Sequence, residues 1–586
     1  MQNSSKISDF QLLKRVLQTA KPFKNLFWAS VTLAILVTPF SIVQPFLVQK
    51  IVDENIIQGK KEGMLLLALL FMLALILNVW MKYLFIYITG KLGQSVIRDM
   101  RIKIFDHITH LRLRYFDTTP IGTSTTRTIN DIEAINNVFA QGVITIIADL
   151  ITLVAVFGLM FYTSWRLTLI VLITMPFMIL ASYIFKEKVK VSYQKVRNQI
   201  ANMNAFLQER ITGMKTVQIF DVEKKEEAAF RNINRNYTAA NLDSVLYYAV
   251  FFPVVELVSS IALALMIWLG AKGYLQDKVT FGALVAFPLY LNLLFRPIRF
   301  LADKFNTLQM GLVAAERVFK ILDNKDFIPD QGNIVASNLK GHVIFKDVCF
   351  SYDGENKVLK GVDFEILPGQ KLAIVGSTGS GKSTIINILN RFYTLESGRV
   401  LIDGTDIHDY KLKSLRSRMA VVLQDVFLFD GSVIDNITLR DSTVLEQKVR
   451  EAANIIGADK YIEQLPGGYQ FHVTERGSNL SVGQRQLISF VRALVSDPDI
   501  FIMDEATSSI DTETESIIQH AIEKLIERRT SIIIAHRLST IRNADKIIVL
   551  ENGEIIEEGT HDSLLNTPES HYKNLYELQF QQIAVI

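Results

Sequence analysis

The sequence has one cysteine and no long basic tract, and each scarcity excludes a class of protein. Cys349 is alone among 586 residues, so no disulfide can form within the chain. It lies in the apolar stretch VIFKDVCFSY, which is typical of a small buried core residue. The formal net charge is +3, and the basic residues are scattered. We therefore expect no nucleic-acid partner, because binding to a phosphate backbone requires clustered lysine and arginine.

The sequence also shows no sign of a secretory signal peptide. The first long apolar run, from about Leu26, ends without a small-residue cleavage site and is long enough to cross a bilayer. Long apolar runs continue to about Leu322, after which short apolar strands alternate with polar helices as in a soluble α/β domain. These patterns predict a membrane domain over residues 1–322, a linker over 323–340 and an α/β domain over 341–586.

Six segments of the first domain are apolar enough to cross about 30 Å of hydrocarbon. They are predicted near residues 25–50, 64–88, 143–162, 165–185, 246–271 and 279–300. Two long polar loops, 89–141 and 186–245, have helical periodicity, so we expect spans two to five to continue beyond the membrane as helical hairpins. Lysine and arginine flank the first span, the second long loop and the last span, which predicts cytosolic termini and cytosolic long loops.

The α/β domain contains a phosphate-binding motif. The strand KLAIV is followed by GSTGSGKST, which matches G-x-x-x-x-G-K-S and opens a helix. The predicted nucleotide-binding residues of this loop are Gly376, Ser377, Thr378, Gly379, Ser380, Gly381, Lys382, Ser383 and Thr384. Glycines let successive backbone N–H groups surround a phosphate, and the helix dipole adds to the attraction. Lys382 is expected to reach the β and γ phosphates, and Ser383 to ligate Mg²⁺.

Two later strands end in polar residues. The stretch DIFIMDE predicts a buried strand that stops at Asp504, which places this carboxylate at the metal and Glu505 at an attacking water. The next strand, SIIIAH, ends in His536. A lone histidine is more often a helix cap or a surface group than a catalytic residue, so the strand by itself does not assign its role.

A second motif, GSNLSVGQRQL, spans residues 477–487. Ser481 and Gln484 fit a capping box, so the helix start exposes N–H donors that suit an anion. A phosphate held by residues 376–383 is already enclosed on its own side, so we infer that this motif closes over a nucleotide held by a second copy of the domain. The alternative is that Ser481 only caps a helix.

Taken in order, these motifs resemble the half-transporters of the ATP-binding-cassette exporter family, of the bacterial multidrug or lipid exporter type. FSYDG resembles the adenine-stacking loop, VVLQD the glutamine loop, LSVGQ the signature, SSID the D-loop and AHR the switch histidine. The segments GTSTTRTINDIEAI and ERITGMKTVQIFDVEKKEEAAF resemble the loops that carry coupling helices. The resemblance implies a six-helix all-α transmembrane domain followed by an α/β P-loop nucleotide-binding domain with an α-helical subdomain.

The resemblance also implies ATP hydrolysis with Mg²⁺. It assigns Glu505 as general base and His536 as the contact to the γ phosphate. Further nucleotide contacts come from Tyr352, Gln424, Ser481, Val482, Gly483, Gln484 and Asp511, and metal contacts from Ser383, Gln424 and Asp504. Val482 replaces the family's usual glycine, and Ser509 and Ile510 replace its usual Ala-Leu. Val482 requires a regular helix start, and its Cβ is expected to crowd the nucleotide.

The resemblance favours a homodimer, leaves a heterodimer open, and places the chain in a bacterial plasma (inner) membrane with its nucleotide-binding domain in the cytosol. We expect hydrophobic or amphiphilic cargo, drugs or lipids. Tyr248, Phe252 and Glu256 share one helical face that suits an amphiphilic cation, and Asp149 is a further candidate. The alternative for Glu256 is a hydrogen bond to neighbouring helices. An ATP-gated channel or regulator, or an importer on the same frame, remains open as an alternative function.

Overall fold

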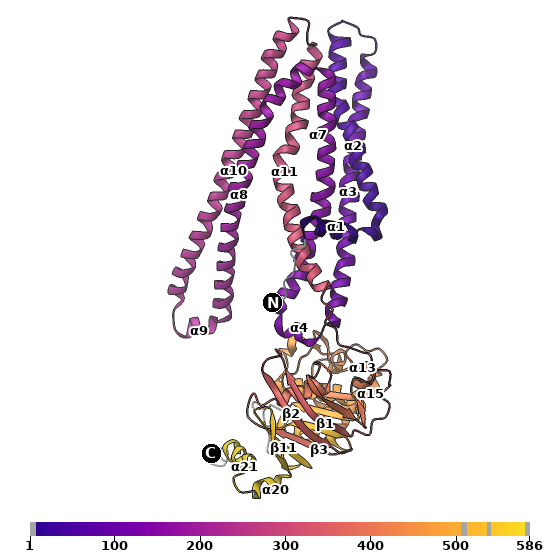
Figure 1. The fold of residues 1–586 in the computed structure, drawn as a ribbon, viewed down its shortest axis with the longest axis vertical. Coiled ribbons are helices and arrows are strands. Elements are labelled where there is room, and N and C mark those ends of the chain that lie inside the picture. Colours follow the sequence, from indigo (N-terminus) through magenta and orange to yellow (C-terminus); the bar gives the residue numbers. More distant parts are fainter. Residues whose placement is uncertain (1–7, 505–511, 536–540, 581–586) are drawn as a thin grey trace. The chain divides into compact units, whose positions relative to one another are not determined.

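The computed structural model describes residues 8–504, 512–535 and 541–580 (Figure 1). Its contacts divide the chain into two compact units. The first comprises Met1–Thr109 and Ile121–Lys325, and the second comprises His110–Pro120 and Asp326–Ile586. Each unit has its own apolar cores.

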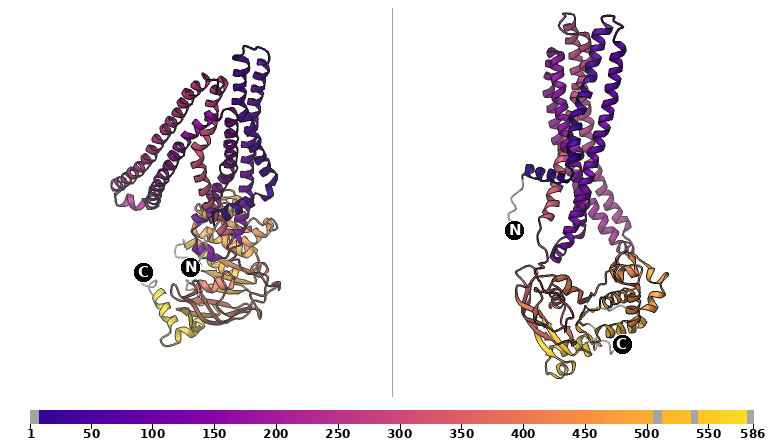
Figure 2. Two further views of the ribbon diagram at one scale, coloured as in Figure 1. Left: turned by 45° about the horizontal axis from the view of Figure 1, so that its top comes forward. Right: turned by 90° about the vertical axis from the view of Figure 1, so that its right-hand side faces the viewer.

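The first unit is helical. Its α-helices are α1 (Asp9–Thr19), α2 (Lys24–Lys50), α3 (Met64–His110), α5 (Ile121–Thr126), α6 (Ile132–Asn137), α7 (Ile144–Thr163), α8 (Trp165–Thr212), α9 (Met214–Ile219), α10 (Glu223–Tyr274) and α11 (Phe281–Leu322). A short 3-10 helix, η1 (Lys21–Phe23), and three π-helical segments, η2 (Ile51–Ile56), η3 (Arg127–Asp131) and η4 (Val138–Val143), connect or extend them. Figure 2 shows α1 lying across the long helices.

Six helical segments of the described chain are long and apolar enough to cross a membrane. They are Lys21–Ile56, Met64–His110, Ile121–Thr163, Trp165–Thr212, Glu223–Tyr274 and Phe281–Leu322. Large apolar side chains are exposed along them, Trp80 and Ile173 among them, which suits a surface solvated by lipid. With 48 residues, α8 is about 72 Å long, well over the thickness of a hydrocarbon core.

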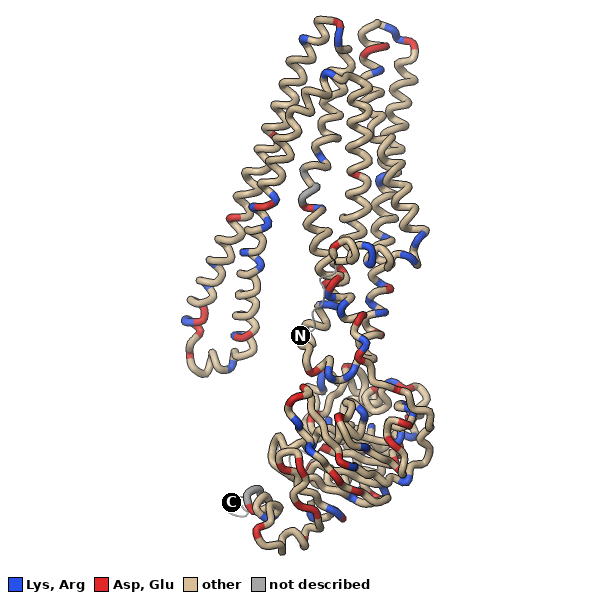
Figure 3. The backbone as a smooth tube through the Cα atoms, in the orientation of Figure 1, with Lys and Arg blue, Asp and Glu red and all other residues tan. Residues whose placement is uncertain are grey.

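Helices α8 and α10 form a long hairpin whose turn is α9 (Figure 1). Phe185 stacks on Phe251 with ring centroids 3.8 Å apart, and the hydroxyls of Ser192 and Ser244 lie 2.7 Å from each other. Figure 3 shows that the charged residues of this hairpin lie mostly in the half next to α9. The apolar half is therefore suited to the membrane and the charged half to water.

Residues 110–120 belong to the second unit, although the sequence had assigned the whole loop 89–141 to the membrane domain. This segment contains α4 (Leu113–Thr118). Leu111 forms an antiparallel β-bridge with Phe327, and Arg112 Nε lies 3.2 Å from Asp326 Oδ1. The difference arises because these partners lie more than two hundred residues apart in the sequence, beyond the reach of local pattern.

The second unit contains two larger sheets and a short ribbon. A six-stranded sheet has the order β12-β11-β3-β10-β9-β6, a four-stranded sheet the order β2-β1-β4-β5, and β7 pairs with β8. The strands are β1 (Val343–Ser351), β2 (Lys357–Ile366), β3 (Lys371–Val375), β4 (Ser397–Ile402), β5 (Thr405–Asp406), β6 (Met419–Val422), β7 (Gly431–Ser432), β8 (His472–Val473), β9 (Ile500–Asp504), β10 (Thr530–Ile534), β11 (Lys546–Glu551) and β12 (Glu554–Gly559).

The larger sheet separates two cores. Its strands are parallel apart from the edge strand β12. After Lys371, the rest of β3 is a continuous buried apolar run, as expected for a strand covered on both faces. Leu372 and Ile374 pack with the four-stranded sheet and α12 (Lys382–Leu389). Ala373 and Val375 pack with the helices on the opposite face, because successive side chains of a strand point to opposite sides.

The remaining helices lie mostly on the other face of the sheet. They are α13 (Leu412–Ser417), α14 (Val433–Thr438), α15 (Glu446–Ile455), α16 (Asp459–Glu463), η5 (Gly468–Gln470), η6 (Glu475–Gly477), α17 (Val482–Val495), α18 (Thr512–Ile526), α20 (His561–Asn566) and α21 (His571–Phe580). Leu415 of α13, in contrast, packs in the core that includes the four-stranded sheet. Helices α14 to α17 form a helical subdomain. Figure 2 shows the strands and these helices, in orange, as separate layers of the second unit.

Candidate nucleotide-binding site

The phosphate loop joins the end of β3 to the start of α12. A Cβ atom on Gly376 would lie 2.1 Å from the carbonyl oxygen of Leu550, so the backbone here passes too close for any other residue. Gly381 has φ 106°, and a Cβ there would lie 2.8 Å from Leu359 Cδ2. The two glycines therefore permit a loop shape that a residue with a side chain would strain. The strand–loop–helix arrangement is the one that the motif predicted.

Lys382 lies in the first turn of α12 and is buried. Its Nζ donates to the carbonyl oxygens of Gly376 at 2.9 Å and Ser377 at 2.8 Å. Burial lowers the pKa of Lys382 below its ordinary value, and the carboxylate of Asp504 partly opposes this shift. The hydroxyl of Ser380 is buried and has no hydrogen-bond partner within the described part of the chain. The loop thus holds a buried cation and a spare donor where a phosphate would bind.

Two of the three predicted metal ligands meet. Ser383 Oγ donates to Asp504 Oδ2 at 3.2 Å, because α12 begins beside the end of β9. Gln424 is exposed and follows β6, which pairs with β9 in parallel register with Val422 opposite Met503. Ser383 thus lies in the first turn of α12, Asp504 ends β9, and Gln424 follows the end of the neighbouring strand β6. Hydroxyl, carboxylate and amide oxygens are the ligand types that Mg²⁺ prefers, so this donor set fits the metal.

Tyr352, the predicted adenine-stacking residue, is held on two sides. Its hydroxyl lies 3.1 Å from Thr384 Oγ1 of α12. Its ring meets Phe350 and Tyr393 edge-on, with centroid separations of 4.8 Å and 5.0 Å. With 39% of its surface exposed, Tyr352 is accessible for stacking while its orientation is fixed by these neighbours.

The second motif begins α17 as its sequence predicted. Ser481 Oγ accepts from the Gln484 backbone N–H at 3.2 Å, and Gln484 Oε1 accepts from the Ser481 backbone N–H at 2.9 Å. The capping box is therefore confirmed. Val482 is the first helical residue and is 42% exposed, and the regular helix start expected from its branched side chain is present. The backbone N–H groups of Val482 and Gly483 are the ones that a capping box leaves over.

Three predicted residues, Glu505, Asp511 and His536, lie outside the described residues. The strands that precede Glu505 and His536 are neighbours in the sheet, with Ile534 of β10 opposite Asp504 of β9.

The predicted cargo residues of the first unit lie partly together. Tyr248 and Phe252 stack on α10 with centroids 6.0 Å apart, and Glu256 is exposed one turn further along the helix. The hydroxyl of Tyr248 lies 3.0 Å from that of Tyr193 on α8. Asp149 is elsewhere: it forms an ion pair with Lys304 of α11, so its charge is already matched.

Tyr393 was not among the site residues that the sequence predicted. It lies shortly after α12, touches Phe350 and Tyr352, and donates a hydrogen bond to Asp117 of α4. The one local signal was the aromatic pair in RFYTL directly behind the phosphate-loop helix, and nothing in that pattern indicates Asp117.

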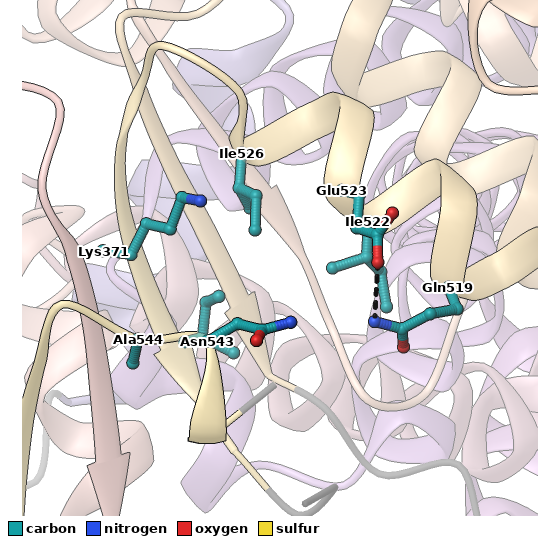
Figure 4. Close-up of a pocket in the computed structure, with 8 residues that line it drawn as sticks. Lys371, Gln519, Ile522, Glu523, Ile526, Asn543 and Ala544 are labelled. Carbon is teal, nitrogen blue, oxygen red and sulfur yellow. Dashed lines mark hydrogen bonds between the residues drawn. The ribbon is translucent and has the colours of Figure 1, made fainter. Parts of the chain in front are cut away.

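A hollow elsewhere in the second unit is too small for a nucleotide. Figure 4 shows it between Lys371, at the start of β3, and Gln519 and Glu523 of α18, which share a hydrogen bond of 3.5 Å. Its volume is about 20 Å³, which is close to the space one water molecule needs. It also lies by the start of β3, whereas the phosphate loop follows the end of that strand.

Comparisons with known proteins identify the family of the chain. The family model for the ABC transporter transmembrane region matches residues 27–298, and the ABC transporter model matches residues 359–508. The ABC transporter ATP-binding protein YknV of Bacillus subtilis is 40% identical over 94% of this chain and 92% of its own length. YgaD of the same organism, named for multidrug export, is 35% identical over 97% of this chain and 99% of its own.

Two further relatives extend the comparison. An ATP-dependent lipid A-core flippase of Desulfotalea psychrophila is 34% identical over 97% of this chain and 99% of its own. The solved structure of a bacterial Atm1-family ABC exporter with ATP bound superposes with a TM-score of 0.77 at 29% identity, covering 96% of this chain and 98% of that one. The chain therefore belongs to the ATP-binding-cassette exporters, as a multi-pass membrane protein with six spanning helices and one ATP-hydrolysing nucleotide-binding domain.

Proposed function

We propose that two copies of this chain form a homodimer that exports amphiphilic drugs or lipids by alternating access. The observation that carries the proposal is the start of α17. Its capping box is complete within one chain, yet the N–H groups of Val482 and Gly483 are left to bind an anion. A phosphate in the loop of the same copy is surrounded by β3 and α12, so the partner's nucleotide is the anion that these donors suit.

Each nucleotide is then held between two chains. Tyr352 stacks on the adenine, Lys382 binds the β and γ phosphates, and Ser481 to Gln484 of the second copy close over the γ phosphate. Ser383, Gln424 and Asp504 would hold Mg²⁺, which supplies charge neutralisation at the phosphate oxygens when bound. Asp511 is a further proposed contact to the nucleotide.

Hydrolysis follows from the same residues. Glu505 takes a proton from water, the water oxygen bonds to the γ phosphorus, and the bond to the β-phosphate oxygen breaks to give ADP and inorganic phosphate. His536 contacts the γ phosphate, and Lys382 stabilises the negative charge that builds up during transfer. Nucleotide binding closes the dimer and hydrolysis opens it, which turns the spans between inward-facing and outward-facing arrangements.

We place the transporter in the plasma (inner) membrane of a bacterium, with both termini and the nucleotide-binding domain in the cytosol. The positive residues that flank the spans support this orientation. The charged half of the α8–α10 hairpin supports it too, because a hairpin about 72 Å long must continue into water beyond the bilayer.

The cargo carries a charged group beside its apolar part. Glu256 is exposed one turn from the stacked rings of Tyr248 and Phe252, a face that suits a cation. A second observation favours the opposite charge: Lys82 of α3 and Arg296 of α11 are exposed at membrane depth and close enough to repel each other. Two positive groups near each other suit an anionic head group. Because Asp149 is matched by Lys304, it contributes to neither face.

ATPase stimulation tests both the function and the cargo charge. The full chain is purified, reconstituted in lipid and exposed to cationic, neutral and anionic amphiphiles of similar apolar volume. Stimulation by cations that Glu256→Gln abolishes, with Lys82→Gln unchanged, supports the cationic face, and the reverse pattern supports the anionic one. An absence of stimulation by every class, together with a current that persists without turnover, would favour an ATP-gated channel instead. Uptake instead of release in loaded vesicles would favour an importer.

A further inference from the structure

Tyr393 joins the proposed adenine site to a helix that comes from the other half of the sequence. Its ring lies 5.0 Å from Tyr352 at an interplanar angle of 89°, and 5.6 Å from Phe350 at 64°. Its hydroxyl donates to Asp117, near the end of α4. All of these residues belong to the second unit, so one side chain contacts both the adenine-stacking residue and the α4 segment.

The far end of α4 is anchored independently. Arg112 Nε donates to the carbonyl oxygen of Phe327 at 2.8 Å, and its backbone N–H donates to that of Asp326 at 3.0 Å. Removing the hydrogen bond between Tyr393 and Asp117 therefore takes away one attachment of α4 while the attachment at Arg112 remains. Helix α4 ends at Thr118, and the chain passes from Pro120 into α5 of the first unit.

Tyr352 cannot turn freely to accommodate a base. Its hydroxyl is fixed by Thr384, and Asn387 Nδ2 donates to the same oxygen at 3.4 Å. An adenine stacked on the Tyr352 ring thus packs against a ring of fixed orientation, which Tyr393 contacts edge-on. Burial and the hydrogen bond to Asp117 hold the pKa of Tyr393 well above its ordinary range, so the phenol stays a donor at any physiological pH.

We propose that Tyr393 is a positioning residue through which α4 responds to the adenine base. This rests on the proposed stacking of adenine on Tyr352. A base stacked on the Tyr352 ring adds packing to the pair that Tyr352 and Tyr393 already form, and the Tyr393 hydroxyl carries this added restraint to Asp117 and with it to the outgoing end of α4. The base, and not the phosphates alone, then sets the position of the segment that leads into the membrane half.

Intrinsic fluorescence provides a readout in the complete protein. All four tryptophans, at positions 28, 80, 165 and 268, lie in the first unit, so an ATP-induced change in their emission reports on the membrane half. The reconstituted full chain is titrated with ATP in the wild type, Tyr393→Phe, Asp117→Ala, Asp117→Asn and the double variant Tyr393→Phe/Asp117→Ala. Tyr393→Phe keeps the ring against Tyr352 and loses only the hydroxyl.

A matched control exists in the same unit. The hydroxyl of Tyr469 donates to Asp459 Oδ1 at 2.7 Å, so Tyr469→Phe removes a tyrosine–aspartate hydrogen bond that touches neither Tyr352 nor α4. If the loss of such a hydrogen bond acted only by destabilising the second unit, Tyr469→Phe and Tyr393→Phe would reduce the ATP-induced fluorescence change equally.

In Tyr393→Phe and Asp117→Ala we expect the fluorescence change at saturating ATP to fall about fivefold, with the KM for ATP hydrolysis within about twofold of wild type. The double variant loses no more than either single variant, because both remove one interaction. Asp117→Asn, which keeps an accepting oxygen, retains most of the response, and Tyr469→Phe retains all of it.

Inorganic triphosphate lacks a base, so it distinguishes the contribution of the base to the fluorescence change from the contribution of the phosphates. At a concentration that displaces ATP, it gives the wild type the reduced response that ATP gives Tyr393→Phe. A full response to triphosphate, a full response in Tyr393→Phe, additive losses in the double variant, or an equal loss in Tyr469→Phe would each overturn the assignment. A wild type that neither binds nor hydrolyses ATP would instead contradict the proposed function itself.

Discussion

At the scale of single residues, Lys382 is the side chain whose surroundings are most specific to a ligand. Its ammonium group is buried against two carbonyl oxygens of its own loop, and burial lowers its pKa. A buried cation is costly unless a negative group approaches it. Bound phosphate would supply that charge, so ATP binding and the relief of this cost occur together.

Lys382→Ala should therefore weaken ATP binding by about tenfold to a hundredfold, the loss expected for a charge-assisted hydrogen bond. The measurement is the rise in melting temperature of the purified chain with added ATP, which reports binding to the folded state. Lys371→Ala, at the opposite end of β3, is the control and should keep the full rise. An unchanged affinity in Lys382→Ala would mean that residues 376–384 do not hold the phosphates.

At the scale of elements, the start of α17 departs most from the family pattern. The position that is usually glycine carries Val482, and the helix there is regular with an intact capping box. The valine side chain is 42% exposed, so the fold of a single chain gains little from it. We expect the valine to weaken nucleotide binding at the proposed contact with the partner's nucleotide, because its branched Cβ crowds the phosphate.

Val482→Gly should raise the affinity for ATP about threefold to tenfold, the range expected when overpacking is relieved. It should also lower the melting temperature slightly, because glycine is a poor helix former. The KM for ATP hydrolysis measures the first effect, and Val482→Ala, which keeps Cβ, should be intermediate. A KM that rises in Val482→Gly would show that the valine helps to bind nucleotide.

The segment 110–120 belongs to the second unit through its tertiary contacts, although its neighbours in the sequence belong to the first unit. Its helical periodicity predicted part of a loop of the membrane domain. The bridge between Leu111 and Phe327 and the hydrogen bond between Tyr393 and Asp117 attach it to the α/β unit. Side-chain period can indicate that a segment is helical, but it carries no information on which distant surface that helix packs against.

At the scale of the whole molecule, the proposal requires two copies. Glu505→Gln should bind ATP with nearly unchanged affinity while hydrolysis falls by about a hundredfold or more, the contribution typical of a general base. With ATP bound and uncleaved, the closed dimer should accumulate. ATPase assays and cross-linking between the nucleotide-binding domains of two full-length chains measure the two effects.

The same idea can be tested without a variant. When the wild-type chain is reconstituted at one copy per nanodisc, its ATPase rate should fall by about a hundredfold relative to two copies, because each site then lacks the donors of the second α17. Undiminished turnover by single copies would contradict the shared site. Full turnover by Glu505→Gln would contradict only the assignment of the base.

The sequence by itself determined the features that depend on neighbours along the chain. Hydropathy alone indicates the spanning helices, the spacing of Gly376, Gly381 and Lys382 defines the phosphate loop, and Ser481 with Gln484 defines a helix start. Each of these needs only a few residues in fixed order, because helix and turn geometry is local. Only the tertiary structure decided that Asp149 pairs with Lys304 and that α4 joins the second unit. It alone also placed Tyr393 between Tyr352 and Asp117, because such pairings are set by the packing of distant segments and leave no period in the sequence.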